Sequence, residues 1–176
     1  MADLTPLLAY RWSPRAFDPS AELTPEESAS LLEAARWAPS AENGQPWRFA
    51  LGHRDDETWK RILISLPVDD QTWIRHAATL VVGAHTGLDT ERAAYDLGQA
   101  IAHLTVQATA LGLHVHQLTR FDRAGLSTEL DLPGGVRPLV VAAIGRLGDP
   151  FALPAELQAR ETGLRRRRPV AELLLR

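Results

Sequence analysis

The stretch TERAAYDLGQAIAHLTVQATAL, residues 90–111, is the longest helical pattern in the chain. Its apolar residues recur three and four positions apart, and small and large ones together surround more than one face. Gly112 follows it, in a position where glycine commonly ends a helix. A helix that is apolar on several faces must be covered by other elements. We therefore predict a central buried helix around which the rest of the fold is arranged.

Other elements flank this helix on both sides in the sequence. Strands are predicted at 47–51, 79–84, 113–118 and 139–144, and 79–84 is a continuous apolar run of strand length. Helical spacing is present at 24–38, 55–65, 122–130, 154–159 and in a tail helix that contains Leu173 and Leu174. The first of these helices begins with a capping signal at Thr24-Pro25-Glu26-Glu27 and ends at Pro39. Because there is no strict βαβ rhythm, the pattern indicates an α+β fold with helices around one sheet.

Composition narrows the class of protein. The chain has 176 residues, 45% of them hydrophobic, and a net charge of −3. These values fit one ordinary globular domain and argue against nucleic acid as the partner of the whole surface. No cysteine is present, which excludes disulfides, thiolate metal sites and cysteine nucleophiles. No signal-peptide pattern and no apolar run long enough for a membrane span are visible, so we expect a cytoplasmic protein outside the membrane.

Basic residues gather near both ends of the chain. Arg11, Ser13 and Arg15 alternate, so in an extended segment their side chains point the same way and can converge on one anion. Near the other end, 165–168 is a run of four arginines. Each feature alone is more simply explained as solvated surface, and the arginine run also fits a polyanion-binding patch. Taken together, the two features look like two halves of one phosphate clamp.

The chain offers no convincing nucleophile, acid or base. The GxSxG, HExxH, GxGxxG and P-loop patterns are all missing from the sequence. His114 and His116 stand two apart on one strand face, which is half of a metal site. A polar pair at the end of a strand is the commoner explanation, and we expect no metal. An enzyme of this composition needs a cofactor to carry its chemistry.

Several segments, taken in order, resemble the FMN-dependent nitroreductase family of NAD(P)H:flavin-type oxidoreductases. They are Arg11-x-Ser13-x-Arg15-x-Phe17, residues 34–40 followed by Asn43-x-Gln45-Pro46-Trp47, residues 112–117 followed by Phe121-Asp122, Ile144-Gly145 with Leu153-Pro154, and Arg165-x-Arg167-x-Pro169. Each segment alone is a weak signal. Their combined order and spacing cover nearly the whole chain and make the resemblance specific.

The resemblance implies a nitroreductase-like fold, in which a central, mainly antiparallel mixed β-sheet is flanked by helices in an intertwined homodimer. It implies a single domain over 1–176 whose segment 160–176 extends onto the partner subunit. FMN is expected at the subunit interface. The implied activity is hydride transfer from NADH or NADPH through flavin N5 to a nitroaromatic, quinone or enone-like small molecule, by a ping-pong mechanism.

The resemblance also assigns residues to the cofactor. The basic segments at both ends are expected to bind the phosphate end of FMN, through Arg11, Trp12, Ser13, Arg15, Arg165 and Arg167. The flavin ring is approached from the other subunit by Pro39, Ser40, Asn43 and Gln45, and near N5 by Gln117, Leu118, Thr119 and Arg120. The flavin carries the chemistry, so no side chain is assigned as catalytic.

Three positions depart from the family pattern. Asp70 stands in the segment before the strand at 79–84, where an Asn commonly contacts the flavin, and Trp73 follows where some members place a cation. Arg120 occupies a position where small residues are common, and it is a candidate contact to substrate or flavin. The segment between Ala84 and Thr90 is short, which favours an open, permissive site. Two alternatives remain: a flavin storage or sensing protein without efficient turnover, and a polyanion-binding protein.

Overall fold

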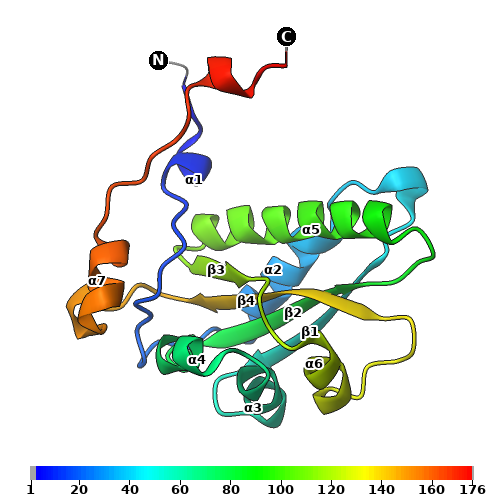
Figure 1. Ribbon diagram of the computed structural model, residues 1–176, viewed down its shortest axis with the longest axis horizontal. Coiled ribbons are helices and arrows are strands. Elements are labelled where there is room, and N and C mark those ends of the chain that lie inside the picture. The colour runs from blue at the N-terminus through cyan, green and yellow to red at the C-terminus, as the bar shows by residue number, and fades with distance from the viewer. Residues whose placement is uncertain (1–2, 176) are drawn as a thin grey trace.

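The computed structural model describes residues 3–175, so residues 1, 2 and 176 of the predicted domain lie outside the described residues. Within that range, four strands form one sheet in the order β1-β2-β4-β3 (Figure 1). The strands are β1 (Trp47–His53), β2 (Thr79–His85), β3 (His114–Leu118) and β4 (Arg137–Gly145). Every neighbouring pair is antiparallel rather than mixed. The predicted α+β class, with a central antiparallel sheet, is confirmed.

Helices surround the sheet on both faces. The α-helices are α1 (Pro6–Ala9), α2 (Pro25–Arg36), α3 (Glu57–Ile64), α4 (Val68–Ile74), α5 (Thr90–Ala110), α6 (Arg123–Glu129) and α7 (Ala155–Glu161). Short 3₁₀ turns are η1 (Ala41–Asn43), η2 (Pro150–Ala152) and η3 (Val170–Leu173). The predicted tail helix is thus a single 3₁₀ turn. The prediction missed α1, which is too short to show a repeating apolar pattern, and α4, which has no side-chain cap at its start.

The molecule has three layers. Helices α2 and α5 pack on one face of the sheet, and α3, α4 and α6 pack on the other (Figure 1). Successive residues of β2 alternate between the two cores: Leu80 and Val82 join the α3–α4–α6 side, whereas Val81 joins the α2–α5 side. A strand covered on both faces has no polar side, which explains why β2 is a continuous apolar run in the sequence.

Helix α5 is buried on one face only, which corrects the prediction of a helix covered all round. Leu97, Ile101 and Leu104 are buried against the sheet and α2. On the opposite face Tyr95 is 69% exposed and His103 is exposed. The spacing of apolar residues predicts the helix, but it does not show which faces are covered, because small residues such as alanine are tolerated on either a buried or an exposed face. The open face is therefore available for packing against a further surface.

Polar side chains fix the ends of the helices. Thr24 and Glu27 form the predicted capping box at the start of α2. Asp56 accepts a hydrogen bond from the backbone N–H of Trp59 at the start of α3, at 2.7 Å.

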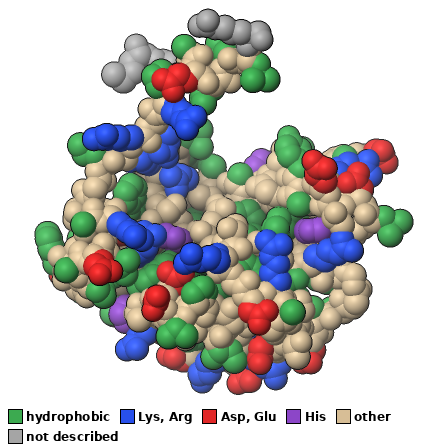
Figure 2. Space-filling view, in the orientation of Figure 1, with side chains coloured by type: hydrophobic (Ala, Val, Ile, Leu, Met, Phe, Trp, Pro, Cys, Tyr) green, Lys and Arg blue, Asp and Glu red, His purple; other side chains and the backbone are tan. Residues whose placement is uncertain are grey.

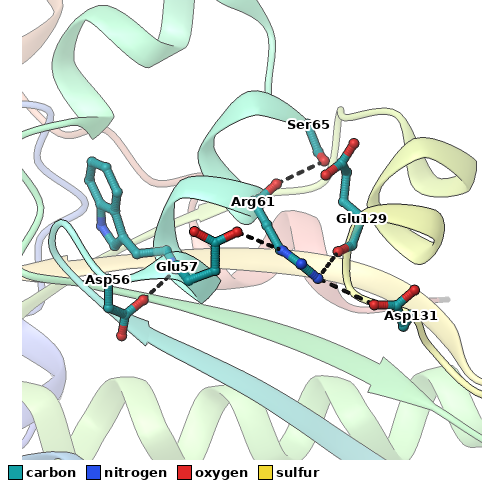
Figure 3. A network of polar contacts seen from close by, with 7 residues as sticks. Asp56, Glu57, Arg61, Ser65, Glu129 and Asp131 are labelled. Atoms are coloured by element: carbon teal, nitrogen blue, oxygen red, sulfur yellow. Dashed lines mark hydrogen bonds and ion pairs between the residues drawn. The ribbon is translucent and has the colours of Figure 1, made fainter.

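A second contact joins α3 to the far end of α6. Arg61 donates to Glu57, to the carbonyl of Glu129 at 2.8 Å and to Asp131 at 3.3 Å (Figure 3). All of these groups are exposed, so the network orients the two helices more than it stabilises them.

We expect Gly52→Ala to destabilise the fold. A Cβ at this position of β1 meets the backbone nitrogen of Trp59 at 2.3 Å, so the strand and α3 have to separate. The free energy of unfolding should fall by about 2 kcal/mol or more, measured by urea denaturation. Gly134→Ala is the matched control, because nothing lies within 4 Å of its Cβ position. Equal stability of the two variants would contradict the close approach.

Candidate functional site

The two ends of the chain lie side by side. We name residues 3–15 the N-terminal arm and residues 162–175 the C-terminal arm; both leave the sheet on the same side (Figure 1). The Arg165 guanidinium donates hydrogen bonds to the carbonyls of Ala9 and Arg11. It also lies over the Trp12 ring, 5.9 Å from the ring centroid. The structure therefore brings together the two basic segments that the sequence separates by most of its length.

Glu161, the last residue of α7, joins the arms at their base. Its carboxylate accepts from the backbone N–H of Arg15 at 3.0 and 3.1 Å and from that of Ala16 at 3.5 Å. It also accepts from the Trp12 indole at 3.4 Å. A carboxylate bonded to backbone N–H groups holds the main chain, and it leaves the neighbouring arginine side chains without an acid of their own.

Three guanidinium groups form a positive cluster between the arms. Arg11 is half-buried and donates to the Ser13 hydroxyl at 2.8 Å. Its pKa is lowered, first by burial and then by the positive charges of Arg165 and Arg167. None of the three arginines forms an ion pair within residues 3–175. Basic side chains can be seen gathered along the arms in Figure 2. Their arrangement favours a bound anion with several oxygens.

A cavity of about 210 Å³ lies at the end of β3, and Arg15 at the base of the N-terminal arm lines it. Most of its lining was predicted from the sequence: Arg15, Asp70, Gln117, Leu118, Thr119 and Arg120. His116, Leu157 and Arg160 complete it. The β3–β4 ladder ends at Leu118, so the peptide groups of the next two residues leave the sheet at this cavity. Free peptide groups at the end of a strand can contact a bound ring.

Trp73 connects the parts of this site. It is 1% exposed, stacks on Phe17 with 6.3 Å between centroids, and packs against His116 at 4.7 Å. The guanidinium of Arg15 lies over it at 5.7 Å. Arg15 therefore turns towards the cavity, whereas Arg11 turns towards the other arm. Trp73, which stands where some members of the family place a cation, is thus a buried residue on which Arg15, Phe17 and His116 pack.

The structure corrects the setting of Asp70, which was expected in a loop. It lies in helix α4, and its carboxylate accepts from the Trp73 indole at 3.2 Å. Pro67 begins this short helix without a side-chain cap, so the usual start signal is missing. One oxygen of Asp70 is thereby engaged inside the protein, although the residue still lines the cavity.

His116 anchors the N-terminal arm to β3. Its Nδ1 donates to the carbonyl of Pro14 at 2.9 Å and approaches that of Ser13 at 3.2 Å. Because carbonyls only accept, Nδ1 carries the proton. Burial and the charge of Arg15 lower the pKa of His116, which favours this neutral form. The sequence analysis interpreted His114 and His116 as a polar pair at the end of a strand. It did not find the role of His116, because the partner of this histidine, Pro14, lies 102 residues away in the sequence.

The predicted residues Pro39, Ser40, Asn43 and Gln45 lie elsewhere. They precede β1, the edge strand opposite β3, so one chain does not bring them to the cavity. Their loop has a defined and strained shape. Asn43 and Gln45 have φ angles of 56° and 45°, and the Gln45 N–H donates to the Ser40 hydroxyl at 3.0 Å. Strained non-glycine residues are maintained where a site requires them.

Among residues 3–175, no three His, Asp or Glu side chains gather closely enough to hold a metal ion. Over the same residues, no helix combines the length and the apolar character needed to cross a bilayer.

Comparison with known proteins gives a consistent result. The model of the nitroreductase family matches residues 8–146. A solved structure described as an oxidoreductase containing FMN is similar over 99% of this chain and 91% of its own, at 34% identity and a TM-score of 0.90.

Two curated relatives match parts of the chain. An uncharacterized 15.4 kDa protein from the ask 5′ region of Mycolicibacterium smegmatis is 34% identical over an alignment of 113 residues that covers 58% of this chain and 76% of that protein. The oxygen-insensitive NAD(P)H nitroreductase of Salmonella typhimurium is 35% identical over 54 residues, which are 31% of this chain and 25% of that enzyme.

We expect Glu161→Ala to loosen the base of the arms. Removing the carboxylate leaves the backbone N–H groups of Arg15 and Ala16 without their acceptor. A hydrogen bond to a charged group contributes about 1.5–3 kcal/mol, so amide exchange at these two residues should accelerate at least about tenfold. Hydrogen-exchange NMR measures this rate. Glu156→Ala, at the exposed start of α7, is the control. Unchanged protection in Glu161→Ala would mean that the tether is not the carboxylate.

Proposed function

As the resemblance predicted, the chain belongs to the nitroreductase family, and on that premise we propose that it is an FMN-dependent oxidoreductase. We propose NADH or NADPH as the reductant and a nitroaromatic, quinone or enone-like molecule as the acceptor. The name of the Salmonella relative supports the reductant, and the description of the similar solved structure supports the flavin.

The observation that carries this proposal is the cluster of Arg11, Arg165 and Arg167. Arg11 is half-buried, whereas Arg165 and Arg167 are exposed, and their positive charges lower the pKa of Arg11. Three neighbouring cations with no acid paired to them in the described residues fit a phosphate group. An effective dielectric constant near 20 gives about 4 kcal/mol of attraction for each opposite charge at 4 Å. The hydroxyl of Ser13 adds a donor on the same side as Arg11. The residues present therefore fit the phosphate end of FMN.

The flavin ring is proposed to lie against the cavity at the end of β3. Gln117 to Arg120 present main-chain groups there, and Trp73 supports the cavity from below. When bound, FMN supplies the redox chemistry, by accepting hydride from the reduced nicotinamide and passing it to the acceptor in turn. The chain itself binds and orients the two reactants. Since the structure offers no acid–base pair in this cavity beyond Asp70 and His116, positioning is its main contribution.

Asp70 and Arg120 adjust the charge of this cavity. With one Asp70 oxygen engaged by Trp73, the other is available to accept a hydrogen bond from the ring. Its negative charge disfavours an anionic reduced flavin. We propose that Arg120, which lines the same cavity, offsets that charge or contacts the acceptor. The short segment 86–89 between β2 and α5 supports an open site with a broad choice of acceptors.

A homodimer is proposed because one chain holds only part of the predicted site. The residues before β1 and those after β3 lie at opposite edges of the sheet, so a second copy must supply the missing group. Leu4, Leu7, Leu173 and Leu174 are exposed on the arms, and α5 has an open face. Burial of this apolar surface against a partner favours association. The segment 160–176, whose last residue lies outside the described range, is proposed to reach over that partner.

The alternative is a flavin-binding protein that stores or senses the cofactor without efficient turnover. The charge of Asp70 is the specific feature that favours it, because a carboxylate beside the ring opposes reduction to an anion. The polyanion-binding alternative is less well supported, because the chain has a net charge of −3 and its residues 8–146 match the nitroreductase family.

The double change Arg11→Ala with Arg167→Ala should release the flavin and weaken the dimer, because ligand and partner stabilise the same arms. Flavin per protein is measured by absorbance, and assembly by sedimentation. The matched control is Arg166→Ala with Arg168→Ala, which removes the same total charge, two arginines, but leaves Arg11 and Arg167 in place. Equal flavin content in the two double variants would refute the clamp assignment.

We expect steady oxidation of NADH or NADPH when menadione or nitrofurazone is added to the yellow protein. Flavin bleaching by the nicotinamide and its return with the acceptor would support the oxidoreductase. A yellow protein that neither reductant bleaches would support the storage alternative.

Arg120→Ala should raise the KM of an anionic aromatic acceptor more than that of menadione, since it removes a cation from the cavity.

A further inference from the structure

A second basic cavity lies where β2 ends and β4 begins. Its volume is about 530 Å³, and it lies between α6, the start of β4 and the start of α5. Polar side chains on one side of it are His85, Arg123 and Arg137, and apolar ones on the other include Ala94 and Leu139. None of these residues belongs to the proposed flavin site. A cavity of this size suits a small organic molecule.

Two strands and one helix bring the polar groups together. His85 ends β2 and is paired in register with Arg137, at the start of β4. Arg123 is the first residue of α6, which packs against β4. Neither arginine forms an ion pair or a side-chain hydrogen bond within the part of the chain that the structure describes. Figure 2 shows basic side chains beside a histidine on the face that carries these elements.

His85 provides an independent sign of a ligand. It is only 5% exposed, and its Nδ1 has no hydrogen-bond partner. Buried polar atoms in native structures nearly always have a partner. Because His85 lines the cavity, a bound group supplies that partner when the ring turns towards it. The positive charges of Arg137 and Arg123, after burial itself, lower the pKa of His85. A cationic ligand is therefore disfavoured, and an anion is favoured.

We propose that this cavity binds an organic oxyanion, a carboxylate or phosphate headgroup attached to a small apolar body. The guanidinium groups of Arg123 and Arg137 hold the oxygens, and the His85 ring, turned towards the cavity, donates a hydrogen bond to one of them. The apolar body packs against Ala94 and Leu139. The site is separate from the flavin, so it serves a second small molecule rather than the redox reaction itself.

The test titrates the purified full-length protein with benzoate, phenyl phosphate, inorganic phosphate and benzyl alcohol. NMR signals of the His85 ring report binding, and those of His53, at the far end of β1, serve as the internal reference. We expect a saturable shift of His85 with benzoate or phenyl phosphate, and the better of the two identifies the headgroup. Benzyl alcohol, which lacks the charge, should cause no saturable shift.

Variants distinguish specific binding in this cavity from non-specific electrostatic attraction to the protein surface. Arg123→Gln and Arg137→Gln should each weaken binding of the preferred aromatic anion at least about tenfold. Arg75→Gln is the matched control, because it removes one exposed positive charge elsewhere and should leave the affinity unchanged. All three should keep the flavin content of the wild type, so a failure here leaves the proposed oxidoreductase standing.

Several results would overturn the proposal. One is the lack of a saturable His85 shift with either aromatic anion. Another is equal weakening by Arg75→Gln and by the two cavity variants, which would indicate only non-specific charge. Binding of inorganic phosphate as tight as that of phenyl phosphate would show that the apolar side of the cavity has no part in recognition.

Discussion

Like-charged guanidinium groups from the two ends of the chain meet at one place, and the arrangement around them follows from that constraint. Arg11, Arg165 and Arg167 repel one another, so other bonds must hold the arms together. Those bonds use the backbone: Glu161 accepts from main-chain N–H groups, and Arg165 donates to main-chain carbonyls. The positive charge is thus left for an anion. A bound oxyanion would neutralise the positive charges of Arg11, Arg165 and Arg167, which no acid of the described residues does.

Trp73 links this charged region to the hydrophobic interior. Its ring contacts Phe17, His116 and the Arg15 guanidinium, while its indole N–H is bound by Asp70. Helix α4, the base of the N-terminal arm and strand β3 therefore share one rigid support. The three-layer core fixes the tryptophan, and the tryptophan fixes the cavity wall. Preorganisation of this kind suits a protein whose role is to position reactants.

Local rules and motif order predicted most of the framework. The capping signal at Thr24, the four strands and Gly112 after α5 all lie where the sequence indicated. Helix α4 was missed because Pro67 supplies no side-chain cap, and that error placed Asp70 in a loop. Glu161 was not found because its partner Arg15 is 146 residues away, and no local pattern records such a contact. The open face of α5 was missed because spacing cannot show which alanines are covered.

The long sequence separation of that tether also bears on how the protein is made. Arg15 leaves the ribosome early, and its carboxylate partner follows 146 residues later. At about 5–20 residues per second, the delay is on the order of ten seconds. The sheet and its helices can collapse within that time, whereas the base of the N-terminal arm has no acceptor until Glu161 has been made. The two arms therefore join at their base only after most of the described fold has had time to form.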